Sequence, residues 1–158
     1  MKDSYTRRNV LKIAGASTLG YACNAQAAEN ESTKVSKLTI GLVADVHQDT
    51  IHDGFTRMRY FIDEMKKRKP DMLLQLGDFA VPRPRNQPFL DTWNEFEGPR
   101  YHVLGNHDMD HKFTKEQTMK WWGMKERYYS FDQHGWHFIV LDGNKPGAPW
   151  IGQIQKDQ

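Results

Sequence analysis

Apolar residues fall into short blocks whose spacing alternates between that of a strand and that of a helix. The run 38–44 is almost continuously apolar and holds β-branched residues, which is typical of a strand buried on both faces. The next block has apolar residues at helical spacing, at Phe55, Met58, Phe61, Ile62 and Met65. Basic residues occupy its other side, and Pro70 ends it. We therefore expect a buried strand followed by an amphipathic helix.

The same alternation continues through the middle of the chain. Residues 71–76 indicate a second strand, a Pro-rich loop follows over 82–88, and residues 100–104 indicate a third strand. Between this loop and the third strand, a helix is expected to bury Phe89, Leu90, Trp93 and Phe96. Each predicted strand is thus separated from the next by a predicted helix.

The last third of the chain predicts one more helix and a hairpin. Thr114 and Gln117 have the spacing of a capping box, for a short helix that runs through Trp122. Residues 128–131 and 136–141 indicate the two strands of a hairpin. The repeated strand–helix unit predicts an α/β fold with a sheet covered by helices.

Residues 1–27 resemble a twin-arginine export signal. Arg7 and Arg8 stand before a weakly apolar stretch over 10–22, and residues 25–27 (Ala-Gln-Ala) form a small-x-small cleavage site. This stretch is too short and too weakly hydrophobic for a permanent membrane span. We expect the twin-arginine translocase to export the folded chain, which would be periplasmic or extracellular. A disordered basic tail is the competing interpretation.

The composition of the mature part excludes several kinds of site. The only cysteine, Cys23, lies in the leader, so disulfides, thiolate zinc sites and cysteine nucleophiles are excluded after cleavage. Lipidation of Cys23 is disfavoured, because Leu19 is one position too far upstream and Tyr21 is bulky for a lipobox. The leader holds four of the 22 basic and one of the 20 acidic residues, so 18 basic and 19 acidic residues remain. Nucleic acid is therefore not a favoured partner.

Polar side chains that can bind metals follow three of the predicted strands. They are Asp45 and His47 after the first strand, Gly77-Asp78 after the second, and Gly105-Asn106-His107-Asp108 after the third. The carboxyl ends of parallel strands form the ligand crevice of an open α/β sheet, so we expect these residues to converge. On extended backbone, two residues two positions apart turn to the same side. The glycines let the backbone approach closely.

This donor set indicates the kind of ion. Two carboxylates, imidazoles and an amide oxygen suit Mn, Fe or Zn better than Ca or Mg. The set lacks the soft sulfur ligand that copper(I) prefers. Two such ions about 3.5–4 Å apart can clamp a phosphoryl group and lower the pKa of a bound water. One carboxylate must bridge them, and we expect Asp78, which stands alone after the middle strand.

In order, spacing and strand-end placement, these three motifs resemble the first three motifs of calcineurin-like metallophosphoesterases. The resemblance covers about 38–143 and implies a β-sandwich flanked by helices (α/β/β/α). The implied metal ligands are Asp45 and His47 for the first ion, Asp78 as the bridge and Asn106 for the second ion. His107 would protonate the leaving oxygen, and Asp108 would hydrogen-bond and orient it. The implied reaction is in-line attack on phosphorus by a metal-bound hydroxide.

The sequence departs from the family pattern in its last part. The later Gly-His and Gly-His-x-His motifs, which supply further metal-binding histidines, do not occur. Residues 153–158 resemble the beginning of a helix. We therefore expect a linker over 28–37 and only the N-terminal half of the domain over 38–158. His134 and His137 could substitute for the missing ligands, but they stand at a predicted hairpin turn, which favours a structural role.

Other polar residues near the motifs have two interpretations each. His52 could reach a substrate, although a solvated loop histidine is favoured. Arg83 and Arg85 could steer a phosphate or simply be exposed loop residues, and this choice stays open. No role is assigned to His102 or His111.

These features predict an exported phosphomonoesterase or phosphodiesterase that acts on a small phosphorylated substrate. A nuclease or a phospholipid-headgroup hydrolase would share the chemistry but need a different surface. The alternative outside the enzymes is a catalytically inactive homologue that binds metal or phosphate. Every motif position expected in the first half of the domain is filled, which favours the enzyme.

Overall fold

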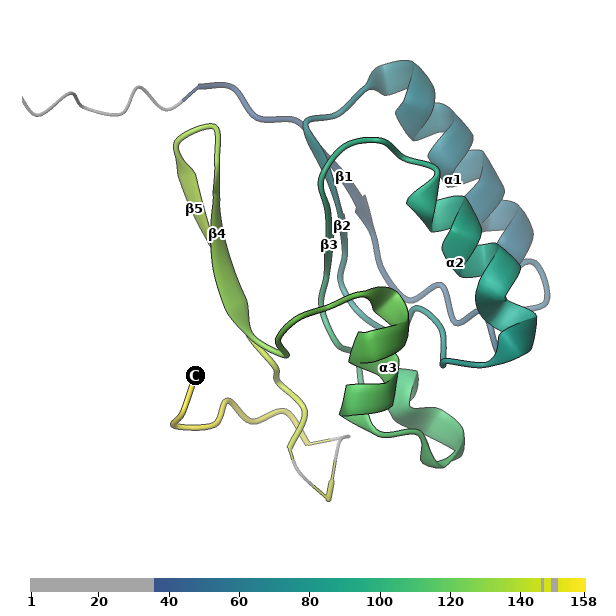
Figure 1. The fold of residues 1–158 in the computed structure, drawn as a ribbon, viewed down its shortest axis with the longest axis vertical. Coiled ribbons are helices and arrows are strands. Elements are labelled where there is room, and N and C mark those ends of the chain that lie inside the picture. The colour runs from purple at the N-terminus through teal and green to yellow at the C-terminus, as the bar shows by residue number, and fades with distance from the viewer. Residues whose placement is uncertain (1–35, 146, 149–150) are drawn as a thin grey trace, which may run out of the picture. The chain divides into compact units, whose positions relative to one another are not determined.

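The computed structural model describes residues 36–145, 147–148 and 151–158. The predicted leader, 1–27, and most of the predicted linker lie outside the described residues. In chain order the elements are β1 (Ile40–Val43), α1 (Gly54–Arg68), β2 (Met72–Gln75), the 3-10 helix η2 (Pro84–Asn86), α2 (Gln87–Asn94), β3 (Arg100–His102), the 3-10 segment η3 (His107–Lys112), α3 (Lys115–Trp122), β4 (Tyr129–Gln133) and β5 (Trp136–Val140) (Figure 1).

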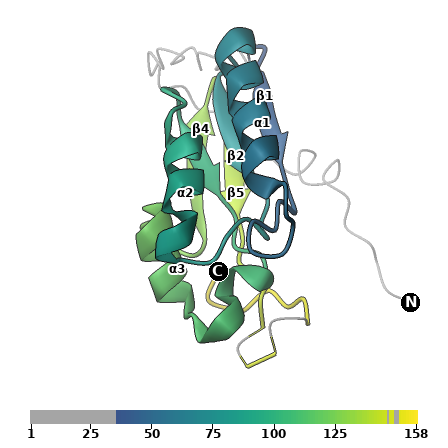
Figure 2. The same ribbon diagram turned by 90° about the vertical axis from the view of Figure 1, so that its right-hand side faces the viewer.

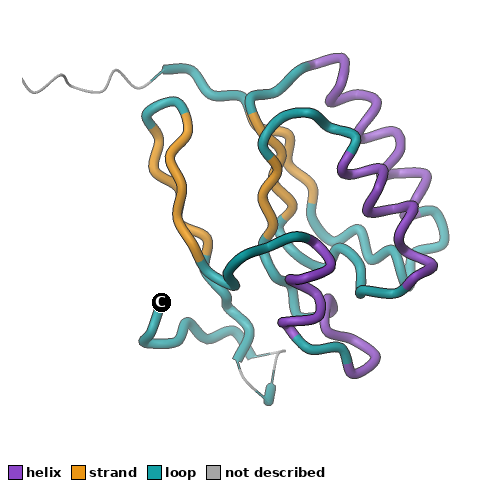
Figure 3. The backbone as a smooth tube through the Cα atoms, in the orientation of Figure 1, coloured by secondary structure: helices purple, strands orange, loops and turns teal. Residues whose placement is uncertain are grey.

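The strands form two separate sheets. β1, β2 and β3 pair in parallel in that order, with Ile40 opposite Met72 and Leu73 opposite Arg100. β4 and β5 form an antiparallel hairpin. Helices α1 and α2 cover one face of the parallel sheet, and the hairpin lies on its other side (Figures 1, 2 and 3). The mixed α/β prediction is thus confirmed. Within the described ranges the layers are helix, sheet and sheet, without the outer helical layer of the expected α/β/β/α order.

The core lies between the parallel sheet and helices α1 and α2. It contains most of the apolar residues that the helical spacing singled out, because these positions share the face of each helix that meets the sheet. Phe61 and Met65 are partly buried against it, and Phe55 is exposed. The buried members are Val46, Met58, Ile62, Leu73, Phe79, Ala80, Phe89, Leu90, Trp93, Phe96, Leu104 and Trp122. Burial of each large apolar side chain stabilises the fold by roughly 1.5–3 kcal/mol.

Capping residues mark the start of α3 and the ends of α1 and α3. The Thr114 hydroxyl accepts a hydrogen bond from the Gln117 N–H, and the Gln117 side chain accepts one from the Thr114 N–H, so the capping box of α3 is confirmed. Gly123 follows α3 in the left-handed conformation, with φ 78°. Lys69 does the same after α1, directly before Pro70. Among the described helices, none combines the length and the apolar character that crossing a membrane requires.

The hairpin is joined to the edge strand β3 by aromatic contacts and by one hydroxyl. Tyr101 stacks on Phe131, which in turn stacks on Phe138 with ring centroids 4.9 Å apart. The Tyr129 hydroxyl accepts from the His102 N–H and donates to the His102 carbonyl oxygen at 2.8 Å. These contacts place β4 against β3 although the two strands do not pair.

The expected helix at residues 153–158 is wrong. Gly152 forms a β-bridge with Asn144, and the Gln153 N–H donates to the Gly143 carbonyl. The Gln158 side chain bonds both the N–H and the carbonyl oxygen of Asp142. Contacts at both ends of this segment, from the Gln153 N–H and from the Gln158 side chain, hold it along residues 142–144, and it does not form a helix.

Candidate metal centre

Three of the predicted ligands meet at the carboxyl ends of β1 and β2. One ligand atom from each of Asp45, His47 and Asp78 lies within 4.8 Å of the others. The His47 Nε2 atom is 3.9 Å from Asp45 Oδ1 and 3.6 Å from Asp78 Oδ2. The side chain of Asp45 is 72% exposed and that of Asp78 only 14%, so the group is open on the Asp45 side. Strand ends far apart in the sequence therefore converge as expected.

The backbone at these three ligands differs from the expectation. Asp45, His47 and Asp78 have φ values of 53°, 47° and 52°, so Asp45 and His47 do not share one side of an extended strand as expected. Each left-handed conformation costs about 1–3 kcal/mol for a residue other than glycine, and such strain gathers at functional sites.

Hydrogen bonds between the two strand-end loops hold this strained backbone. The Asp45 N–H donates to the Gly77 carbonyl, and the His47 N–H donates to the Asp78 carbonyl at 2.8 Å. The loops after β1 and β2 thus continue to pair beyond the strands.

The two motif glycines are needed for a close approach of backbones. A Cβ atom at Gly105 would lie 2.2 Å from both the backbone nitrogen and Oδ1 of Asp78. A Cβ atom at Gly77, where φ is 103°, would lie 2.7 Å from the Gly105 Cα atom. Any side chain at Gly105 would displace the central carboxylate of the site.

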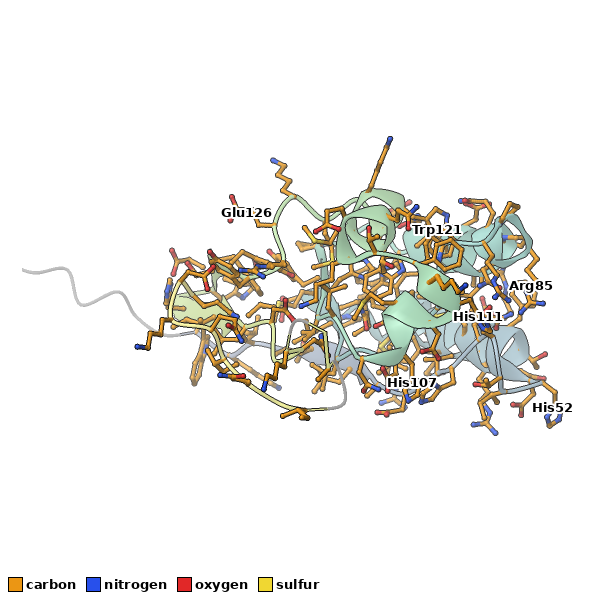
Figure 4. All side chains as sticks on the ribbon, turned by 90° about the horizontal axis from the view of Figure 1, so that it is seen from below. His52, Arg85, His107, His111, Trp121 and Glu126 are labelled. Atoms are coloured by element: carbon orange, nitrogen blue, oxygen red, sulfur yellow. The ribbon has the colours of Figure 1, made fainter. Side chains whose placement is uncertain are left out.

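The third motif lies against the first two. The His107 N–H donates to Asp78 Oδ1 at 3.0 Å, and the rings of His47 and His107 meet edge to face with centroids 5.2 Å apart. Figure 4 views this end of the sheet and shows His107 and His111 on η3. Asn106 is half-buried directly before η3. Its role as ligand of a second ion stays a prediction.

The Asp108 carboxylate does not hydrogen-bond His107 as expected, because its oxygens accept from backbone N–H groups of other segments. Its carboxylate is buried and accepts four backbone N–H bonds, from Asp78, Phe79, Ala80 and Gly105. It therefore holds the Gly-Asp loop against the third motif. Burial raises the pKa of Asp108 to about 7, and the N–H donors oppose this rise.

Asp110 takes the place expected for Asp108. The His107 Nδ1 atom is 2.9 Å from Asp110 Oδ2, and this hydrogen bond raises the pKa of His107. Since a carboxylate only accepts, Nδ1 donates, and Nε2 is left as the nitrogen that can give a proton to a ligand. The i to i+3 spacing of the two residues was the available signal, and it becomes meaningful only once η3 is known to turn here.

His102 and the two hairpin histidines lie away from this group. His102 is buried against Phe79, Trp93 and Trp122, and burial lowers its pKa to about 3. His134 is at the hairpin turn, and His137 Nδ1 pairs with Asp132 on the neighbouring strand at 2.8 Å. Neither hairpin histidine belongs to the cluster of Asp45, His47 and Asp78.

The cluster fits a divalent cation by its donor chemistry. Two carboxylates and one imidazole within reach of one ion match the preferences of Mn, Fe and Zn. The strained backbone and the close glycine contacts hold these donors in place. This arrangement is compatible with Lewis-acid chemistry on a phosphoryl group.

The chain is similar to known proteins over most of its described residues. The family model of the calcineurin-like phosphoesterases matches residues 38–155. A solved structure of a dimetal phosphatase from Danio rerio is 19% identical, with a TM-score of 0.42, and the match covers 52% of this chain and 33% of that chain. The chain thus spans about a third of the length of that phosphatase. No curated protein matches the chain. On the family match, the chain belongs to the calcineurin-like phosphoesterase family.

Proposed function

We propose that this protein is a metal-dependent hydrolase of phosphoesters, acting on a small phosphomonoester or phosphodiester. The observation that carries the proposal is the convergence of Asp45, His47 and Asp78 from separate strand ends, with the His107 ring beside them. The family match supports the same chemistry. The resemblance of the three strand-end motifs to those of two-metal phosphoesterases is the basis for proposing two ions, of Mn, Fe or Zn.

The chain's own residues have distinct tasks in this proposal. Asp45 and His47 would hold one ion, Asn106 the second, and Asp78 both, since its Oδ2 faces His47 and its Oδ1 is tied to the third motif. Bound ions would stabilise phosphoryl charge and lower the pKa of water. Asp108 supports Asp78 from behind by accepting its backbone N–H.

His107 would protonate the leaving oxygen. Its Nδ1 donates to Asp110, which orients the ring and favours the imidazolium. The proton on Nε2 is then the one available to the leaving group. His107 is therefore proposed as the general acid and Asp110 as its positioning residue.

The test compares p-nitrophenyl phosphate with bis(p-nitrophenyl) phosphate in the presence of Mn²⁺. Asp78→Asn should abolish both hydrolysis and bound metal. His107→Gln should lower kcat by about 100-fold and retain the metal. Loss of metal in the His107 variant would contradict its role as acid.

The hairpin supplies a matched control. His137 Nδ1 pairs with Asp132 at 2.8 Å and is 56% exposed, against 2.9 Å and 50% for His107 with Asp110. His137→Gln should leave both activity and metal content unchanged. An equal loss in both variants would overturn the assignment.

We also propose export by the twin-arginine route. The support is the Arg7-Arg8 pair and the cleavage site at 25–27. Replacing both arginines by lysine should keep the protein in the cytoplasm, as measured by cell fractionation. Unchanged export of that variant would contradict the proposal.

A further inference from the structure

A buried carboxylate just after the first motif holds an arginine-containing loop. The side chain of Asp49 is only 9% exposed. It accepts from the Val81 N–H at 3.0 Å, and the Asn86 amide nitrogen donates to both of its oxygens. Arg85 donates to Asp49 Oδ1 at 3.1 Å, and Arg83 lies 3.9 Å from the same oxygen. The loop after β2 is therefore fixed to the segment that follows β1.

Arg85 keeps donors for a ligand. Its side chain is 61% exposed, and its hydrogen bond to Asp49 uses one of the five N–H groups of a guanidinium. Figure 4 shows the Arg85 and His52 side chains projecting outward from their loops. Arg83 and Arg85 together carry two positive charges against the one negative charge of Asp49. The exposed side of this loop therefore attracts anions.

The cleft beside Arg85 and the cavity at the metal site share two lining residues. A cleft of about 280 Å³ has Asp49, Thr50, His52 and Arg85 among its lining residues. Asp49 and Thr50 also line the cleft that contains Asp78 and the third motif. A substrate that lies against Asp78 would reach Arg85 along Thr50, which lines both cavities.

We propose that Arg85 binds a second phosphate group, on the leaving-group side of the substrate. This inference rests on the proposed function, because the metal cluster must take the first phosphate. His107 and His111 line the same cleft as Thr50, so the group that His107 protonates departs on this side. A guanidinium fixed by a buried carboxylate offers the planar donor pair that a phosphate accepts. The preferred substrates are therefore phosphoesters with a second phosphate.

The test uses two substrates that differ only in the distal phosphate. With Mn²⁺ supplied, kcat/KM for hexane-1,6-diol bisphosphate should exceed that for hexyl phosphate by about tenfold. Arg85→Ala should reduce this ratio to about two, the statistical value for two equivalent phosphates, and leave hexyl phosphate hydrolysis unchanged. Arg85→Lys should retain part of the preference, because it keeps the charge without the planar donor pair.

Arg68, the last residue of α1, provides a matched control. It is 71% exposed and pairs with Glu64 at 2.6 Å, so its exposure and pairing resemble those of Arg85. Arg68→Ala should keep the full preference for the bisphosphate. A ratio of about two or less in the unchanged protein, or an unchanged ratio in Arg85→Ala, would overturn the inference while the hydrolase function stands.

Hydrolysis of neither substrate would count against the proposed function, and binding would then decide the inference separately. The side-chain Nε–H signal of Arg85 should shift in ¹⁵N NMR during titration with hexane-1,6-diol bisphosphate, and the signal of Arg68 should not. Equal shifts of both signals, or none at Arg85, would refute the subsite.

Discussion

Asp78 and Phe79 are neighbours in the chain but belong to opposite kinds of structure. Asp78 lies at the polar end of the sheet with left-handed backbone, and its carboxylate faces His47. Phe79 is 1% exposed and its ring contacts those of Phe89, Trp93 and Trp122. Strained polar backbone and dense aromatic packing thus meet at two adjacent residues. The comparison indicates that the aromatic packing of Phe79 fixes the position of Asp78 in the metal site.

The magnitudes are consistent with this division. Holding a residue such as Asp78 in the left-handed region costs about 1–3 kcal/mol. Burying an aromatic ring such as that of Phe79 is favourable by a comparable or larger amount, since its truncation typically costs about 3–5 kcal/mol. The packing beneath the site can therefore offset the strain within it.

The largest effect on stability is expected from Phe79→Ala. The free energy of unfolding should fall by about 3–5 kcal/mol, and Mn²⁺ affinity should fall with it, because Asp78 loses its anchor. Urea denaturation and metal titration measure the two quantities.

Met58, on α1, provides the comparison for this variant. Met58→Ala should lower stability by about 2–5 kcal/mol without weakening Mn²⁺ binding in the folded protein. Phe79→Leu serves as the milder change if the alanine variant does not fold. Equal Mn²⁺ affinities in the Phe79 and Met58 variants would contradict the anchoring role.

Gly105→Ala should disrupt the metal site although it replaces none of the predicted ligands. Its Cβ atom would overlap Asp78, so the carboxylate must move, at a cost of about 1–3 kcal/mol. Metal content should drop to background while the near-UV signal of the aromatic core persists. Gly143→Ala is the control, because no atom lies within 4 Å of a Cβ there. Retention of metal by the Gly105 variant would contradict the close approach.

Asp110→Asn should have a smaller, pH-dependent effect. Asp110 raises the pKa of His107, which must be protonated to act as an acid, so activity is lost as pH rises through that pKa. Removing the carboxylate lowers the pKa, and the alkaline limb of the kcat profile should move to lower pH. The kcat value near neutral pH should fall about tenfold. If the alkaline limb of the kcat profile stays at the same pH, Asp110 does not act through His107.

The smallest effect is expected at the cap of α3. Thr114→Ala removes the acceptor for the Gln117 N–H and should lower stability by about 1 kcal/mol. Metal binding should not change, because the cap lies beyond η3. Thermal unfolding and metal content measure the two effects, and weakened metal binding would show that α3 supports the site more directly than its contacts indicate.

The sequence predicts the parts that depend on local pattern. The spacing of Met58 and Ile62 predicts the buried face of α1, and the capping box predicts the start of α3. The meeting of Asp45 with Asp78 follows from parallel strand ends, so it was predictable as well.

Other features depend on contacts between distant segments. The left-handed backbone at Asp45 and His47 arises from pairing with the loop after β2, which composition does not reveal. The partners of Asp49 stand more than thirty positions away, at 81–86. The course of 153–158 depends on residues 142–145, so its local pattern alone gave a wrong helix.

The most direct test of the central claim is to locate Mn²⁺ by paramagnetic broadening of histidine ring signals. The account predicts that the signals of His47 and His107 broaden at the first additions, while those of His134 and His137 on the hairpin stay sharp. Asp78→Asn should remove the effect at His47 and His107. Broadening centred on the hairpin histidines, or unaffected signals at His47, would contradict a metal centre at the strand ends.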